Sequence, residues 1–163
     1  MVLKLLKNGY LPLLPILSWN LVLTAHLPPA FQPGVFNEDI PFWVLVGENL
    51  FRVIVFLMPL FLMLNIRTPR GRWGLVVCLL GVVAYGLSWL VLILAPESNL
   101  GSSVLGFAAP AYTPIIWLIG MALMADSYYF RVTYSPWHFA IPALGFSLFH
   151  IYHAWLVYGR FYA

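Results

Sequence analysis

Five apolar stretches dominate the sequence, and each is about as long as a membrane-crossing helix. They run over residues 9–25, 41–65, 73–95, 104–126 and 137–159, and each is bounded by proline, glycine or charged residues. A helix needs about 20 apolar residues to cross the hydrocarbon core of a bilayer. Charged residues make up only 8% of the chain, against roughly 25% in soluble domains. We therefore predict an all-α integral membrane protein, a single domain over residues 1–163 formed by a bundle of five transmembrane helices.

The chain contains 13 prolines, many for a helical protein of 163 residues. Those inside or at the edge of predicted spans are Pro12, Pro15, Pro59, Pro110, Pro114 and Pro142. Each removes a backbone donor and frees a carbonyl one turn earlier, so several helices are expected to be proline-kinked. Residues 106–114 hold two of these prolines, and irregular backbone at membrane depth is tolerated only where protein buries it or a cavity adjoins it. This stretch predicts a cavity near the external face.

The basic residues predict the orientation in the membrane. In a five-span chain, one side receives six of the eight basic residues, and the opposite side receives Arg160; the six are Lys4, Lys7, Arg67, Arg70, Arg72 and Arg131. Short loops rich in Lys and Arg stay in the cytoplasm. We expect a multi-pass protein of the plasma or inner cell membrane with its N-terminus inside.

Two charged residues lie within the second span, where charge is costly. Counting about 1.5 Å per residue from the external start of that helix, Glu48 lies about 10 Å and Arg52 about 16 Å deep. An arginine near the midplane costs at least about 2.5–3.5 kcal/mol on insertion scales. Glu48 precedes Arg52 by four residues, which places both side chains on one helix face in the favourable order. Asn49 adds an amide that can bond to either residue or to a neighbouring helix.

The fifth span places two histidines at a similar depth. Counted from the external end, His153 lies about 9 Å and His150 about 13 Å deep, and their spacing of three puts both rings on one face. The other spans contribute polar groups to the same outer half: Asn20, Tyr85, Ser88, Tyr112 and Thr113. The inner half is almost uniformly apolar. This asymmetry predicts one polar pocket inside the membrane, open to the external side.

The chemistry of these groups suggests the function. Intramembrane ionisable residues are functional candidates because they are expensive to keep. We predict that the pocket binds a small amphipathic or lipid-like molecule, with Glu48, His150 and His153 as candidate acid–base catalysts. The predicted ligand-binding residues are Asn20, Asn49, Arg52, Tyr85, Ser88, Tyr112 and Thr113. Arg52 favours a carboxylate, phosphate or enolate oxygen.

Other interpretations of the same residues stay open. The protein is alternatively a non-catalytic membrane subunit or assembly factor, in which Glu48 and Arg52 fix helix packing and the histidines reach towards the headgroups. A third interpretation is a metal or haem site using His150 and His153, although two histidines three apart are a weak pattern. A transporter is disfavoured by the odd number of spans unless the chain dimerises.

The sequence identifies no cofactor. Cys78 is the only cysteine, which excludes an internal disulfide and a cysteine-based metal cluster. The sequence contains no Walker loop or glycine-rich nucleotide motif. Membrane lipids and a small amphipathic ligand are the expected partners, together with a second copy of the chain or a membrane-complex partner, and nucleic acid is not expected.

Overall fold

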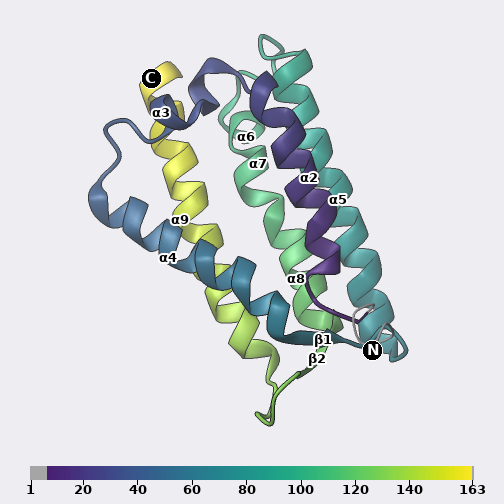
Figure 1. The fold of residues 1–163 in the computed structure, drawn as a ribbon. Coiled ribbons are helices and arrows are strands. Elements are labelled where there is room, and N and C mark those ends of the chain that lie inside the picture. Colours follow the sequence, from purple (N-terminus) through teal and green to yellow (C-terminus); the bar gives the residue numbers. More distant parts are fainter. Residues whose placement is uncertain (1–6, 163) are drawn as a thin grey trace.

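The protein is a bundle of helices that run alternately between the two ends of the molecule, as seen in a computed structural model that describes residues 7–162 (Figure 1). Lys4, which contributes to the predicted orientation, lies outside the described residues. The helical elements are η1 (Leu11–Leu13), α2 (Leu14–Leu23), η2 (Thr24–His26), η3 (Pro29–Phe31), α3 (Pro33–Phe36), α4 (Phe42–Leu57), η4 (Met58–Phe61), α5 (Pro69–Leu94), α6 (Val104–Phe107), α7 (Ala109–Tyr112), α8 (Pro114–Met124) and α9 (Pro136–Tyr162). Two short strands, β1 (Leu62–Leu64) and β2 (Ala125–Tyr128), join them.

Three helical segments of the described chain are long and apolar enough to cross a membrane. They are Phe42–Phe61, Pro69–Leu94 and Pro136–Tyr162. Two further apolar segments, Leu11–His26 and Ala109–Met124, are shorter, at 10–17 residues. Large apolar side chains cover the outside of the bundle, and Leu21 and Phe42 are about four-fifths exposed. Such a surface is typical of a protein that contacts lipid.

Prolines set the limits of several helices. The predicted span 41–65 is longer than its helix, because the backbone tightens to a 3-10 turn at Met58–Phe61 and then extends into β1. Pro59 lies in that turn and has no N–H to donate to the preceding turn. The predicted span 104–126 is divided into α6, α7 and α8 and ends in β2, and Pro110 and Pro114 lie in the first turns of α7 and α8. Pro142 lies inside α9, which continues past it.

Glycines allow two helix pairs to approach closely. A Cβ built on Gly81 of α5 would lie 2.3 Å from the backbone nitrogen of Trp117 on α8, and one on Gly120 of α8 would lie 2.4 Å from the nitrogen of Cys78. In the second pair, α4 and α9, Gly47 faces the ring of Phe149. Small residues are the usual means by which membrane helices pack in the absence of a hydrophobic driving force.

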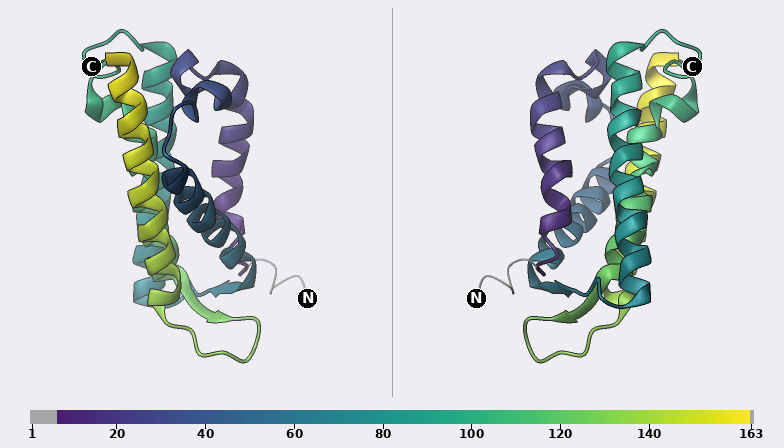
Figure 2. Two further views of the ribbon diagram at one scale, coloured as in Figure 1. Left: turned by 90° about the vertical axis from the view of Figure 1, so that its left-hand side faces the viewer. Right: turned by 90° about the vertical axis from the view of Figure 1, so that its right-hand side faces the viewer.

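A two-stranded antiparallel sheet closes one end of the bundle. Leu62 pairs with Tyr128 and Met63 with Ser127, and the N-terminal segment adds a bridge from Asn8 to Met63. Figure 2 shows the sheet at one end of the bundle and the last turns of α9 at the opposite end. The loops that carry Arg67 and Arg131 adjoin the sheet in sequence, so they belong to the same end.

Candidate functional site

Glu48 is the centre of a cluster of charged side chains between α4 and α9. Its carboxylate is buried, and Oε1 accepts hydrogen bonds from Nη2 of Arg52 on its own helix and from Nδ1 of His150, at 3.0 Å. Oε2 faces Nδ1 of His153 at 2.5 Å. Gly47 and Gly145 allow this approach, because each lies directly against a phenylalanine ring of the opposite helix. The structure therefore brings the predicted catalytic residues into direct contact.

The hydrogen-bond partners of His153 indicate where the protons of this cluster lie. Its Nε2 lies 2.9 Å from the carbonyl oxygen of Phe36, which can only accept, so Nε2 carries a proton. A second proton lies between Nδ1 and Oε2 of Glu48, because neither atom can face the other at this distance without one. Whichever atom holds that proton, Glu48 and His153 together have no net charge. The guanidinium of Arg52 therefore leaves the cluster with at least one positive charge.

Arg52 and His150 extend from the cluster into a cavity. The Arg52 side chain is partly exposed, donates from Nη1 to Oδ1 of Asn49 at 3.1 Å, and lies 5.9 Å from the centroid of the Phe146 ring. His150 stacks on the same ring with a centroid distance of 5.2 Å. Its Nδ1 is held by Glu48, and within the part of the chain that the structure describes its Nε2 has no hydrogen-bond partner.

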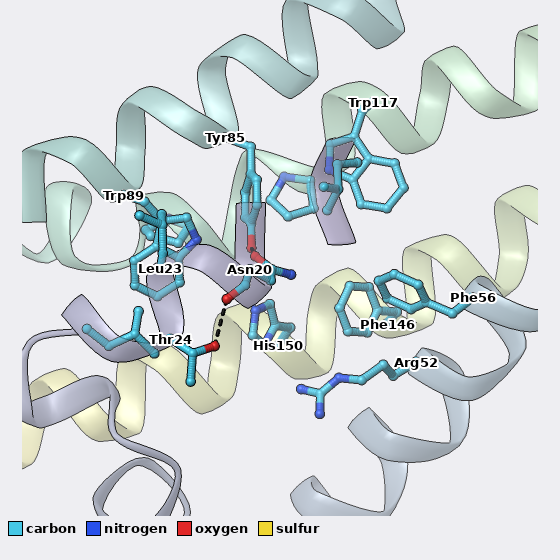
Figure 3. Close-up of a pocket in the computed structure, with 14 residues that line it drawn as sticks. Asn20, Leu23, Thr24, Arg52, Phe56, Tyr85, Trp89, Trp117, Phe146 and His150 are labelled. Atoms are coloured by element: carbon cyan, nitrogen blue, oxygen red, sulfur yellow. Dashed lines mark hydrogen bonds between the residues drawn. The ribbon is translucent and has the colours of Figure 1, made fainter. Parts of the chain in front are cut away.

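The cavity lies in the middle of the bundle, with a volume of about 340 Å³. Figure 3 shows its polar group, in which Asn20 and Tyr85 meet opposite His150 and Arg52. The hydroxyl of Tyr85 donates to Oδ1 of Asn20 at 2.5 Å. The rest of the wall is mainly apolar or aromatic and comes from α2, α4, α5, α7, α8, α9 and the turn after α2: Ile16, Leu23, Thr24, Leu27, Phe56, Trp89, Pro110, Pro114, Trp117 and Phe146.

A second cavity of about 230 Å³ adjoins the first and reaches towards the segment between α2 and α4. The two share Leu27, Arg52, Trp89, Pro110 and His150. Phe36 and Asn37 of that segment line the second cavity. His153 binds the carbonyl oxygen of Phe36, and Arg160 donates to the carbonyl oxygens of Glu38 and Val35. These bonds fix the segment above the cluster.

The remaining predicted binding residues are placed differently. Ser88 and Thr113 are buried, donate to carbonyl oxygens of Tyr85 and Ala109 in the preceding turn, and do not line the cavity. Tyr112 is partly exposed and donates to the carbonyl oxygen of Leu105. Asn49 is exposed on α4, and its side-chain oxygen accepts a hydrogen bond from Arg52. The structure thus brings Asn20, Tyr85, Arg52 and His150 to one cavity and leaves these four outside its wall.

Sequence reasoning missed the aromatic part of the wall and the contact of the loop with His153. Trp89 follows Tyr85 by one helical turn, a spacing that could have predicted it. Pro110 and Pro114 belong to the irregular stretch that predicted a cavity, and both line it. Phe36 accepts the hydrogen bond from His153 through its backbone carbonyl, which every residue type carries, so the sequence did not indicate this contact.

The histidines do not form a metal site with other side chains in residues 7–162. No group of three His, Cys, Asp or Glu side chains there is arranged to hold a metal ion. Both histidines direct Nδ1 to the same carboxylate, and Nε2 of His153 is occupied by Phe36. The ring atom available to a ligand is therefore Nε2 of His150.

Comparison with known proteins provides no family for this chain. No protein-family model, curated protein or solved structure matches it. Since function depends on the chemistry of a site more than on the fold that carries it, the cavity and its charged cluster provide the basis for a functional proposal.

Proposed function

We propose that the protein crosses the plasma or inner cell membrane five times and binds a small amphipathic molecule in the central cavity. The observation that carries this proposal is the cavity wall, which combines Arg52, His150 and the Asn20–Tyr85 pair with aromatic surface. Small-molecule sites are typically concave, mostly apolar and supplied with a few polar groups, and they start at about 300 Å³. A molecule with a polar head and an apolar body fits such a wall.

Five crossings with the N-terminus in the cytoplasm agree with the course of the chain. Three long apolar segments and two shorter ones follow one another along the chain, and successive segments run in opposite directions (Figure 1). The end that holds the two-stranded sheet also carries most of the basic residues, which favours the cytoplasmic side.

Cysteine labelling tests this topology. The native Cys78 is 2% exposed, so the parent protein gives little background with a membrane-impermeant maleimide. Asn99→Cys, in the loop after α5, should react in intact cells, whereas Thr133→Cys, in the loop before α9, should react only after the cells are opened. Labelling of Thr133→Cys in intact cells would contradict the orientation.

Mass analysis of gently purified protein tests the binding. Leu23 lines the cavity, whereas Leu21 on the same helix is 79% exposed, so Leu23→Trp fills the cavity and Leu21→Trp is its matched control. We expect native mass spectrometry to detect a small amphiphile near one equivalent on the wild type and on Leu21→Trp, and much less on Leu23→Trp. Equal content in all three proteins, or none in any, would favour the alternative of a non-catalytic membrane subunit.

The geometry of His150 supports a second candidate function, proton transfer to or from the bound molecule. Glu48 holds Nδ1 of His150 at 3.0 Å, and His150 lines the cavity. A carboxylate that fixes one ring nitrogen leaves the other as the acid or base. If this function is correct, the co-purified molecule should gain carbon-bound deuterium during incubation in D2O, and His150→Ala should abolish the gain while His26→Ala, outside the cavity, should not. Absence of exchange in the wild type would limit the site to binding.

A further inference from the structure

The charge and the hydrogen-bond donors of the cavity indicate the class of its ligand. We propose that the molecule bound there is a single-chain amphiphile with a carboxylate head group, and that this head group lies between Arg52 and His150. This inference rests on the proposed binding function and makes it more specific.

The cluster carries a positive charge that no described residue neutralises. Because Glu48 and His153 together have no net charge, the ion pair between Glu48 and Arg52 leaves the cluster as a whole with the charge of the guanidinium. The described carboxylates other than Glu48 belong to Glu38, Asp39, Glu97 and Asp126, in loops or in β2, and the cavity walls contain none of them. An uncompensated cation at this depth is costly. A ligand with one negative charge would neutralise it.

The wall also offers more donors than acceptors. Trp89 and Trp117 both line the cavity, and their indole N–H groups are buried without a partner among the residues described. Trp117 is 2% exposed, so water outside the bundle does not accept a hydrogen bond from its indole N–H. The amide oxygen of Asn20 already accepts from Tyr85, and the Thr24 hydroxyl donates to the backbone carbonyl of Asn20. A carboxylate only accepts, so it matches the N–H groups of Arg52 and of the indoles. Because Nδ1 of His150 donates to Glu48, Nε2 of a neutral ring is an acceptor, and a carboxylate hydrogen bonds to it only when Nε2 also carries a proton.

Arg52 has free donors for such a head group. Its guanidinium has five N–H groups, of which one bonds to Glu48 and one to Asn49. The planar arrangement of the others suits two carboxylate oxygens, and Figure 3 shows the guanidinium directed into the space beside His150. An ammonium head group would be repelled by Arg52. A doubly charged phosphate would exceed the single charge that the guanidinium of Arg52 supplies.

The apolar part of the ligand has a defined place. Phe56, Phe146 and Trp117 group on one side of the polar residues, as Figure 3 shows. At about 340 Å³ the cavity is near the small end of the range for ligand sites, which favours one hydrocarbon chain over two.

Binding of three probes with the same chain length tests the inference. Dodecanoate, dodecanol and dodecylamine are titrated by calorimetry into the whole protein in a nonionic detergent. We expect dodecanoate to bind at least about tenfold more tightly than dodecanol, the difference expected of charge-assisted hydrogen bonds, and dodecylamine to bind most weakly. Equal affinity for the acid and the alcohol would overturn the inference while leaving amphiphile binding intact.

Variants locate the head group. Arg52→Gln should remove most of the preference for the acid, Arg52→Lys should retain part of it, and Arg72→Gln, near the opposite end of the bundle, should leave it unchanged. Trp89→Phe removes one indole donor without a change of charge, and it should weaken the binding of dodecanoate severalfold more than the binding of dodecanol. This variant tests the placement even if Arg52→Gln does not fold. A preference unaffected by both Arg52→Gln and Trp89→Phe would contradict the placement. Tighter binding of dodecyl phosphate than of dodecanoate would overturn the carboxylate assignment.

Discussion

The three partners of Glu48 differ in burial, and this difference should rank their contributions to stability. The His153 side chain is 1% exposed and that of Arg52 is 42% exposed. Partly exposed ion pairs contribute about 0.2–1 kcal/mol, and hydrogen bonds between membrane helices average about 0.6 kcal/mol with a maximum near 1.7 kcal/mol. We therefore expect a coupling free energy of about 1.5 kcal/mol between Glu48 and His153, and about 0.5 kcal/mol between Glu48 and Arg52.

Double-mutant cycles measure these couplings. Glu48→Gln is combined with His153→Phe, which keeps a ring against Phe36, or with Arg52→Met, which keeps the aliphatic stem. The free energy of unfolding is obtained by titrating mixed micelles with sodium dodecyl sulfate and following far-ultraviolet circular dichroism. The lost bond from His153 to the Phe36 carbonyl is common to both halves of its cycle and cancels. A coupling with Arg52 equal to or larger than that with His153 would refute the reasoning.

Two further predictions concern packing and a buried phenol. Gly120→Ala should destabilise the protein by about 1–3 kcal/mol in the same unfolding assay, because the new methyl group would lie 2.4 Å from the backbone nitrogen of Cys78. Gly86→Ala is the control: its methyl group meets only the ring of Trp19, at 3.5 Å, so it should be neutral or stabilising by up to about 1 kcal/mol. Burial, reinforced by Tyr128, raises the pKa of Tyr134 to about 12 although Arg70 lowers it, and the Tyr134 hydroxyl has no partner among the described residues. The folded state therefore keeps a proton that the unfolded state loses above pH ~10, so stability should fall as the pH rises from there. Tyr134→Phe should reduce this fall, add about 1 kcal/mol at neutral pH, and remove one late-ionising phenol from an ultraviolet titration.

The central contacts of the site follow from helical spacing and depth. Glu48 and Arg52 are four residues apart, His150 and His153 are three apart, and all four lie at similar depth in the predicted spans. Neighbouring helices that run in opposite directions bring residues together when their depths, counted from the same end of the bundle, are equal. This is why a sequence pattern was sufficient to predict residues 102 positions apart as neighbours.

The positions of the other predicted residues depend on side-chain direction and local hydrogen bonds, which the spacing of residues in the sequence does not specify. Asn49 follows Glu48 by one residue, so it is turned about 100° away on the helix and faces outwards. Ser88 and Thr113 bond to carbonyls of their own helices, a local alternative open to any hydroxyl in a helix. The end of the second span was placed by hydropathy, which does not distinguish an apolar helix from the apolar strand β1, and the fourth span was extended two residues into the polar strand β2.

The small sheet has a consequence for the order of events during synthesis. β1 lies between the N-terminal segment and β2, with Leu64 donating to the carbonyl oxygen of Lys7 at 2.7 Å and Leu62 paired with Tyr128. The first helix therefore gains its anchor only after residue 64 has left the ribosome, and that anchor is itself completed only when residue 128 has followed. Until then this end of the bundle stays open, so the first half of the chain must wait for residue 128 before its sheet is complete.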